Sequence, residues 1–312
     1  MTDPAALAAV ADALGAGARR GVPLGPMTTY RVGGAAALLA EASTEEELLH
    51  VRRALRRGGG RVPVLVIGKG SNLLVADRGF AGLVLRLGRG LGAVDLPSRG
   101  AVPDRPVAVR AGGGADLPVV ARRSVGAGLR GLEWAVGIPG TVGGAVRMNA
   151  GGHGSDMASC LVRFRWLDVA GDGGGQDGPG RLDYRYRGSS LSAGEVVVWA
   201  ELAARPGEPA AAREQLREIV RWRRENQPGG SNAGSVFVNP PGDSAGRLVE
   251  EAGLKGLRLG TARVSEKHAN FIQADDGGTA ADVVALMDRV REAVAARCGV
   301  ELRPEVRLVG FG

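Results

Sequence analysis

Hydrophobic and polar positions alternate with two different periods along the chain, which predicts a mixed α and β fold. Short apolar runs between turn residues are typical of strands. They occur at Val62–Ile67, Leu73–Val75, Leu83–Leu87, Val107–Ala111, Leu161–Val169 and Glu195–Leu202. Amphipathic runs predict helices at Pro4–Leu14, Thr44–Arg57 and Leu117–Ala127, and Thr44 with Glu47 resembles a capping box. The polar extended run Met27–Gly34 is predicted to be a strand that enters a tight turn.

The pattern changes after Arg205–Pro209, a Pro- and Gly-containing stretch that is expected to act as a hinge. Helices and strands then alternate to the end of the chain. Helices are predicted at Ala210–Asn226, Ser244–Ala252 and Thr279–Arg297, and strands at Val236–Val238, Arg263–Gln273 and Val300–Val309. This alternation predicts a separate small α/β unit.

The stretch Gly137–Gly144 (GIPGTVGG) consists almost entirely of residues that allow close backbone approach or a sharp turn. A helix would lose about 1 kcal/mol at each interior glycine and more at Pro139, so propensity favours a tight loop. Loops with so few side chains often present amide N–H groups to an anion or a flat ring. An ordinary connector between two packed strands is the alternative.

A second small-residue stretch, Gly68–Asn72 (GKGSN), follows the predicted strand Val62–Ile67. It is not a Walker loop, because the lysine is not followed by Ser or Thr at the required spacing. Its N–H groups and the Ser71 hydroxyl could converge on a diphosphate, and a simple β-turn is the alternative.

Composition indicates a globular chain of 312 residues, 44% of them hydrophobic, for which two or three domains are expected. Forty basic and thirty-three acidic residues give a net charge of +7, but the arginines are scattered and aromatic residues make up only 4%. A nucleic-acid partner is therefore not expected. No apolar run approaches the roughly 20 residues that a membrane span needs, so no membrane association is expected. Cys160 and Cys298 resemble free thiols of a reducing compartment, and a cytoplasmic location is expected.

Few residues are suited to hydrolytic chemistry. The three histidines have no partners at metal-ligand spacing, so no metal site and no Ser-His-Asp triad are expected. Alternation in SEKHANF (Ser265–Phe271) would aim Glu266 and His268 to one face of a strand. Ser235 follows Ala-Gly and precedes an apolar run, where a hydroxyl can be presented into a cleft. Glu305 interrupts the apolar final strand. Its carboxylate is either a buried charge with a paired partner or an acid that faces a site.

An ordered set of motifs resembles the UDP-N-acetylmuramate dehydrogenase family, also called UDP-N-acetylenolpyruvoylglucosamine reductase. The resemblance extends from about Thr28 to Gly310, and the spacing after Arg187 together with SEKHANF resembles the shorter of the family's two structural types. The motifs are MTTYRVGG, GKGSNLLVADRGFAGLVL, GLRGLEWAVGIPGTVGGAVRMNAGGHG, YRGSS, NAGSVFVNPPGDSAGRLVEEAGLKG, SEKHANF and LRPEVRLVG.

The resemblance implies an α+β flavoenzyme with a PCMH/vanillyl-alcohol-oxidase-type FAD-binding fold of two subdomains and a small α/β substrate-capping domain. The implied subdomains are residues 1–88 and 89–206, the capping domain is 207–299, and the strand in 300–312 returns to the flavin part. FAD would be bound non-covalently, NADPH would donate the hydride, and a monomer is expected. The implied cofactor-binding residues are Arg31, Gly68, Lys69, Gly70, Ser71, Asn72, Gly137, Ile138, Pro139, Gly140, Thr141, Gly144 and Asn149.

The resemblance also implies roles in the reduction of UDP-N-acetylglucosamine enolpyruvate. Arg187 would pair with the substrate carboxylate as it becomes enolate-like. Ser235 would donate a proton to carbon, and Glu305, protonated or sharing a proton, would hydrogen-bond the carboxylate. The implied substrate contacts are Asn239 and Lys255, with Tyr186 and His268 as further candidates.

Two positions depart from the family pattern. The family often has lysines where this chain has Asn226 and Val238, which removes phosphate-facing charge that Arg223 or Arg224 could replace. Two rival functions remain open: a flavin oxidoreductase of the same fold that acts on another nucleotide sugar, and a flavin- or nucleotide-binding regulator without turnover. Because a regulator needs no proton donor, the presence of Ser235 with Arg187 and Glu305 argues against it.

Overall fold

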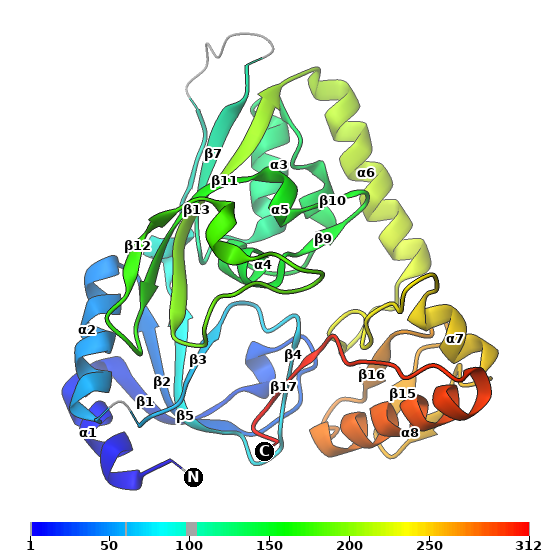
Figure 1. Ribbon diagram of the computed structural model, residues 1–312, viewed down its shortest axis with the longest axis horizontal. Coiled ribbons are helices and arrows are strands. Elements are labelled where there is room, and N and C mark those ends of the chain that lie inside the picture. The colour runs from blue at the N-terminus through cyan, green and yellow to red at the C-terminus, as the bar shows by residue number, and fades with distance from the viewer. Residues whose placement is uncertain (1, 60, 98–104, 312) are drawn as a thin grey trace. The chain divides into compact units, whose positions relative to one another are not determined.

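The computed structural model describes residues 2–59, 61–97 and 105–311, and the chain divides into two compact units (Figure 1). Unit 1 consists of Met1–Arg20, Leu38–Gly68 and Gly82–Arg223. Unit 2 consists of Gly21–Ala37, Lys69–Ala81 and Arg224–Gly312. Each unit therefore contains segments that are far apart in the sequence.

Two sheets and their helices account for most of unit 1, although residues 21–23 of β1, 35–37 of β2 and 80–81 of β5 belong to unit 2. A four-stranded sheet has the order β1-β2-β5-β3, and its strands are β1 (Ala18–Pro23), β2 (Ala35–Ala42), β3 (Val64–Ile67) and β5 (Phe80–Leu87). The main path of a six-stranded sheet has the order β12-β11-β13-β7-β6, and β8 pairs with β13. Its strands are β6 (Val94–Asp95), β7 (Val107–Gly112), β8 (Leu129–Arg130), β11 (Leu161–Asp168), β12 (Gly174–Asp177) and β13 (Glu195–Pro206). The helices are α1 (Pro4–Leu14), α2 (Glu45–Arg57), α3 (Leu117–Gly126), α4 (Val142–Met148), α5 (Met157–Cys160) and α6 (Pro209–Asn226), of which α6 enters unit 2 at Arg224.

Local signals explain where these elements begin and end. The hydroxyl of Thr44 accepts a hydrogen bond from the Glu47 N–H and starts α2, whose first turn is acidic and whose last turn is basic. Both charge biases complement the helix dipole. Strand β13 is almost wholly buried and pairs with β11 on one side and β7 on the other, as its continuous apolar run requires.

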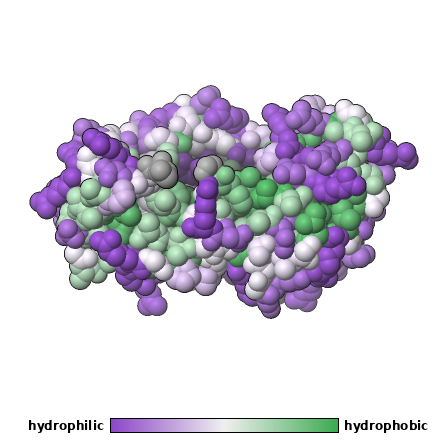
Figure 2. Space-filling view, turned by 90° about the horizontal axis from the view of Figure 1, so that it is seen from below, coloured by the Kyte–Doolittle hydropathy of each residue, from purple (hydrophilic) through white to green (hydrophobic). Residues whose placement is uncertain are grey.

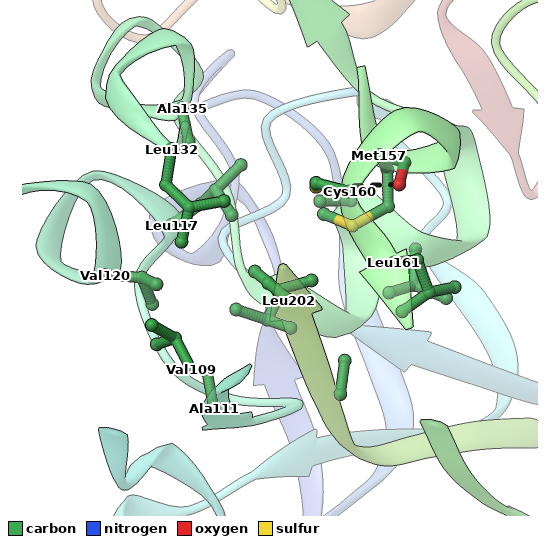
Figure 3. Close-up of a cluster of buried hydrophobic side chains, with 14 of the residues drawn as sticks. Val109, Ala111, Leu117, Val120, Leu132, Ala135, Met157, Cys160, Leu161 and Leu202 are labelled. Carbon is green, nitrogen blue, oxygen red and sulfur yellow. Dashed lines mark hydrogen bonds between the residues drawn. The ribbon is translucent and has the colours of Figure 1, made fainter. Parts of the chain in front are cut away.

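The core of unit 1 contains one large apolar cluster, part of which Figure 3 shows. Leu117 and Val120 of α3, Leu202 of β13, and Met157 with Cys160 of α5 belong to this cluster. The Cys160 thiol lies 3.6 Å from the Met157 carbonyl, and burial raises its pKa to about 12. Both cysteines are free, and Cys160 is therefore an inert core thiol.

Unit 2 contains a small sheet covered by a helix. Strands β14 (Arg258–Leu259), β15 (Ala262–Val264) and β16 (Ile272–Ala274) form an antiparallel sheet that α8 (Ala280–Cys298) packs against (Figure 1). Helix α7 (Ala245–Glu251) contacts α8, and the C-terminal strand β17 (Arg307–Val309) pairs in parallel with β4 (Leu73–Val75). The small two-stranded sheet of β9 (Gly151–Gly152) and β10 (Ser155–Asp156) belongs to unit 1.

Four predicted elements differ from the structure. Val236–Val238 is not a strand, because the Asn270 carbonyl accepts the Val236 N–H and only an isolated bridge joins Phe237 to Pro304. Met27–Gly34 is not a strand, because a 3₁₀ turn over Gly25–Met27 precedes it and the Thr28 hydroxyl accepts the Arg31 N–H. Arg263–Gln273 is not one strand but β15, a loop and β16. The predicted strand Val300–Val309 is reduced to Arg307–Val309, so Glu305 lies outside a strand.

The surface mixes hydrophilic and apolar residues, as the face in Figure 2 shows. Tyr186, Val162 and Trp222 are the most exposed large apolar side chains of the described chain, at 58%, 46% and 46%. None of the described helices combines the length and the apolar character that crossing a membrane requires.

Candidate active site

Two glycine-rich segments meet within unit 1. Gly68 follows β3, and a Cβ atom added to it would lie 2.4 Å from the Thr141 hydroxyl oxygen. Such a distance is far inside van der Waals contact, so the backbone of Gly68 rests directly on Thr141. The first residue of GKGSN is thus brought against the middle of GIPGTVGG, although the two segments are distant in the sequence.

The segment GIPGTVGG is only partly the loop that its composition predicts. Thr141 caps α4, since its hydroxyl accepts the Gly144 N–H at 3.3 Å, and both Gly143 and Gly144 lie in the helix. A Cβ at Gly143 would lie 3.0 Å from the Gly113 carbonyl oxygen, which the Gly143 N–H bonds at 2.8 Å. The glycine therefore permits this close packing, which compensates for its low helix propensity.

The rest of GKGSN belongs to unit 2. Gly70 has φ 59°, and a Cβ there would lie 2.6 Å from the Met27 carbonyl oxygen. The Asn72 amide donates to the Glu305 carbonyl at 3.2 Å, and the Asn72 carbonyl accepts the Arg307 N–H at 3.0 Å. Asn72 thus fixes the backbone that carries Glu305. Lys69 and Arg31 are exposed, and Ser71 is half-buried.

Asn149 ends α4 in the left-handed conformation, with φ 41°. Its side-chain oxygen accepts the Ala158 N–H at 2.9 Å, and its side-chain nitrogen donates to the Arg185 carbonyl at 3.4 Å. Asn149 therefore links α5 to the turn that carries Arg187.

Arg187 lies in a tight turn of unit 1. The backbone groups of Arg185 and Gly188 bond each other at 3.1 and 3.2 Å, which leaves Tyr186 and Arg187 as the two central residues. Arg187 has φ 56°, a conformation that usually requires glycine at the second central position of a turn. Its guanidinium carbon lies 5.1 Å from the centre of the exposed Tyr186 ring. The turn presents both side chains from one short segment.

Ser235 and Glu305 are brought to neighbouring segments of unit 2. The Glu305 N–H donates to the carbonyl of Val236, the residue after Ser235, at 2.7 Å. A bridge between Phe237 and Pro304 extends this pairing. Gly234, with φ 78°, turns the chain just before Ser235. Among the residues that the structure describes, none forms a hydrogen bond with the Ser235 hydroxyl.

The predicted substrate contacts Lys255, His268 and Asn239 also lie in unit 2. Burial lowers the pKa of His268, and the nearby Lys255 charge acts in the same direction. The His268 Nδ1 atom accepts the Asn270 N–H at 3.2 Å, and the ring packs against Phe271. Asn239 accepts the first backbone N–H of α7 at 3.0 Å, and Lys255 pairs with Glu250 at 2.7 Å.

The expectation that His268 and Glu266 share one face of a strand is wrong, because the Ser265–Phe271 segment is a loop. The Ser265 hydroxyl accepts the backbone N–H groups of Lys267 and His268 at 3.1 and 3.4 Å and turns the chain there. The sequence prediction also missed Asn270, a buried residue whose side chain bonds the backbone of Phe237.

The glycine-rich segments of unit 1 fit a flavin cofactor. A Cβ at Gly68 would clash with the Thr141 side chain and one at Gly143 would crowd the Gly113 carbonyl, so bare backbone packs closely at both places. Backbone of this kind can approach a diphosphate and a flat ring closely.

Comparison with known proteins first defines the class. The profile of an FAD binding domain matches residues 36–173, which include Gly68 and the whole of GIPGTVGG. The chain is therefore an FAD-binding protein. The profile of the UDP-N-acetylenolpyruvoylglucosamine reductase C-terminal domain matches residues 226–309, which include Ser235 and Glu305.

Full-length relatives then define the family. A reductase of Heliobacterium modesticaldum is 45% identical over 92% of this chain and 89% of its own length. A reductase of Rubrobacter xylanophilus is 45% identical over 92% and 94%. Both bear the name UDP-N-acetylenolpyruvoylglucosamine reductase. This chain belongs to the UDP-N-acetylenolpyruvoylglucosamine reductase family.

A solved structure supports the fold. The crystal structure of UDP-N-acetylenolpyruvylglucosamine reductase from Thermus caldophilus superposes with a TM-score of 0.79 at 35% identity. It covers 92% of this chain and 97% of that protein. The predicted family, the α+β PCMH/vanillyl-alcohol-oxidase-type fold, the oxidoreductase class and the FAD cofactor are confirmed.

Proposed function

We propose that this protein reduces the enolpyruvyl double bond of UDP-N-acetylglucosamine enolpyruvate to give UDP-N-acetylmuramate for peptidoglycan synthesis, with NADPH as the hydride donor. The observation that carries this proposal is the pairing of the Glu305 segment with the residue after Ser235, in a chain of the reductase family. The pairing joins the chain segments that carry Ser235 and Glu305, within the residues that match the C-terminal domain of the named reductases.

The glycine-rich backbone would hold the cofactor. Gly68 and the segment from Gly137 to Gly144 supply the backbone groups, with Gly70, Ser71 and Asn72 from the rest of GKGSN, and Arg31, Lys69 and Asn149 as further candidates. When bound, FAD accepts a hydride from NADPH and supplies it to the substrate.

The side chains of the protein would manage the charge and the proton. Addition of a hydride to the methylene carbon moves an electron pair toward the adjacent carbon and its carboxylate. Arg187 would stabilise this charge with a planar guanidinium that matches a carboxylate. The Ser235 hydroxyl would donate its proton to the carbanionic carbon, which completes addition of one hydride and one proton across the double bond. Glu305 would hydrogen-bond the same carboxyl group.

Remaining contacts would bind the nucleotide sugar. Lys255 would contact the diphosphate, Asn239 and His268 the neighbouring sugar, and the exposed Tyr186 ring an apolar face of the substrate. The motif resemblance expects lysines at the positions of Asn226 and Val238, and Arg223 or Arg224 would supply the replacement charge.

The domain division into 1–88, 89–206 and 207–299, with 300–312 returning to the flavin part, is part of this proposal. Parallel pairing of β17 with β4, which lies within 1–88, supports the return of the C-terminal segment to that proposed subdomain. A monomer in the cytoplasm, where nucleotide sugars and NADPH are available, is proposed as well.

Anaerobic stopped-flow spectroscopy tests the function. The protein with FAD should be reduced by NADPH and then reoxidised by UDP-N-acetylglucosamine enolpyruvate, with UDP-N-acetylmuramate detected by mass spectrometry. Reoxidation only by another nucleotide sugar would favour the first rival function. Absence of any reoxidation would favour a regulator.

Two Ser235 variants test the proton donor. Ser235→Ala should slow reoxidation by substrate by about 10²–10⁴-fold, the usual contribution of general acid catalysis, and should leave reduction by NADPH near the wild-type rate. Ser235→Cys should retain more activity than Ser235→Ala, because a thiol is the better acid. Normal reoxidation in Ser235→Ala would remove Ser235 from the mechanism.

A further inference from the structure

Asn270 forms a buried clamp on the backbone beside Ser235. Only 3% of Asn270 is exposed, and its side chain bonds both backbone groups of one residue. The Phe237 N–H donates to Asn270 Oδ1 at 2.9 Å, and Asn270 Nδ2 donates to the Phe237 carbonyl at 2.8 Å. The Asn270 carbonyl also accepts the Val236 N–H at 2.8 Å. Asn270 thus satisfies backbone groups of Val236 and Phe237 that a neighbouring strand would otherwise bond.

The other edge of the same segment bonds the backbone that carries Glu305. The Glu305 N–H donates to the Val236 carbonyl at 2.7 Å, and the Val238 N–H donates to the Arg303 carbonyl at 2.9 Å. The two residues after Ser235 are therefore held from both sides. The position of Ser235 relative to Glu305 depends on both contacts.

The residue before Ser235 is fixed as well. The Asn232 side-chain oxygen accepts the Gly234 N–H at 3.0 Å, where Gly234 turns the chain with φ 78°. Ser235 thus stands between two fixed points, one set by Asn232 and one by Asn270. Phe237 is buried in the core of unit 2, so an apolar residue at 270 would leave its N–H and carbonyl without partners.

We propose that Asn270 is a positioning residue for proton transfer by Ser235. The inference rests on the function proposed above and deepens it. Both polar atoms of the Asn270 amide are engaged by Phe237, so Asn270 acts through the backbone and not by contact with substrate. Loss of the clamp would displace the Ser235 hydroxyl, and proton transfer to carbon is sensitive to such displacement.

The variant Asn270→Asp makes the clamp depend on pH. A carboxylic acid can donate to the Phe237 carbonyl and accept its N–H, as the amide does, whereas a carboxylate can only accept. Burial raises the pKa of the introduced carboxyl group above its usual value. The nearby titratable and charged groups are Glu266, Lys267 and His268 on the same loop, Lys255 beside His268, and Glu305 on the neighbouring segment. Wild type contains all of them, so the difference between the two proteins isolates the new group.

Stopped-flow measurements across pH give the expected result. Below the pKa of the introduced group, Asn270→Asp should be reoxidised by UDP-N-acetylglucosamine enolpyruvate at nearly the wild-type rate. Above that pKa the rate constant should fall by about 10²-fold, the size expected from a displacement near 1 Å. The rate constant for reduction by NADPH should follow wild type throughout. Rate constants, unlike amplitudes, are not lowered by an unfolded fraction of the sample.

Gln273→Glu is the matched control. It makes the same amide-to-carboxyl change three residues away, where the Gln273 side chain donates to the Gly229 carbonyl at 2.8 Å in an exposed position. This variant should acquire no new titration in either half-reaction. The same titration in both variants would overturn the proposal, because it would be a general effect of added charge.

A double-mutant cycle separates action through Ser235 from other routes. In the Ser235→Ala background, Asn270→Asp should cause no further slowing of reoxidation at high pH, because the displaced hydroxyl is already absent. Additive losses would overturn the proposed route.

Thermal unfolding without substrate gives a readout independent of activity. An acid whose pKa is higher in the folded than in the unfolded state loses stability as pH rises between the two values, so Asn270→Asp should melt progressively below wild type over that range. If unfolding shows this trend while reoxidation follows wild type at every pH, Asn270 supports only the fold and the proposal fails. If wild type itself is not reoxidised by the enolpyruvyl substrate, the proposed function fails first.

Discussion

Because of the backbone conformation of Arg187, we expect the variant Arg187→Gly to be more stable than Arg187→Ala. This is the reverse of the usual order, in which alanine is the more stable residue. Arg187 occupies the second central position of the Arg185–Gly188 turn with φ 56°. An L side chain in this region crowds its own backbone, whereas glycine does not. Arg187→Ala and Arg187→Gly both remove the guanidinium and every contact it makes. The comparison between them therefore isolates the backbone conformation.

The magnitude follows from two opposing effects. A non-glycine residue in the left-handed region costs roughly 1–2 kcal/mol, whereas glycine loses roughly 0.5–1 kcal/mol more backbone entropy on folding. Arg187→Gly should therefore be more stable than Arg187→Ala by about 0.5–1 kcal/mol, which corresponds to about 1–3 °C in melting temperature. At Arg185, which has a negative φ, the order should be the usual one, with glycine below alanine.

Four variants, Ala and Gly at positions 187 and 185, are compared by thermal unfolding at one pH and one FAD concentration. Arg187→Ala and Arg187→Gly should also lose reoxidation by substrate to the same extent, about 10²–10³-fold, because neither supplies a cation to the carboxylate. The reasoning is refuted if alanine is the more stable residue at both positions, since φ at 187 would then carry no strain.

Three further changes test other parts of the structure. Gly68→Ala places a Cβ 2.4 Å from the Thr141 hydroxyl oxygen and should weaken FAD binding, measured by fluorescence titration of the apoprotein; unchanged affinity would argue against the packed cradle. Asp77 accepts the first two backbone N–H groups of α8 at 2.8 and 2.9 Å, so Asp77→Ala should lower the unfolding free energy by about 1 kcal/mol in urea titrations. Hydrogen bonds from Thr261 lower the pKa of Asp282. The charged Asp282 thus stabilises the fold at neutral pH, and the deficit of Asp282→Asn should shrink as pH falls below about 4; a constant deficit would contradict this.

Helices were predictable where the sequence contains their capping signals. Thr44 and Thr279 each accept the N–H three residues later, and α2 and α8 begin directly after them. The apolar pattern then determined the helix length, because it requires one buried face. The close packing of Gly68 on Thr141 could not be deduced in this way, since it depends on how two distant segments fold together.

The errors arose where side chains bond the local backbone. Alternation in Arg263–Gln273 has a strand period, but the Ser265 hydroxyl bonds two backbone N–H groups and interrupts the strand. Ser and Thr compete with regular pairing in this manner, so Ser265 was the available signal. Asn270 gave no comparable signal, because its partners Val236 and Phe237 are far away in the sequence.

Strained backbone conformations, with positive φ at residues other than glycine, coincide with part of the candidate site. Within the described chain, five non-glycine residues have positive φ, and Arg31, Asn149 and Arg187 are three that the motif resemblance had assigned to cofactor or substrate. Glycine would suit each backbone better, so the side chains are retained for another reason. At Asn149 the amide bonds Ala158 and Arg185, which compensates for the strain within the protein. The planar guanidinium of Arg187 matches the carboxylate of the proposed substrate, which gives this side chain a role in the proposed reaction. We propose that the reaction accounts for an arginine at position 187, whereas the bonds to Ala158 and Arg185 account for the asparagine at position 149.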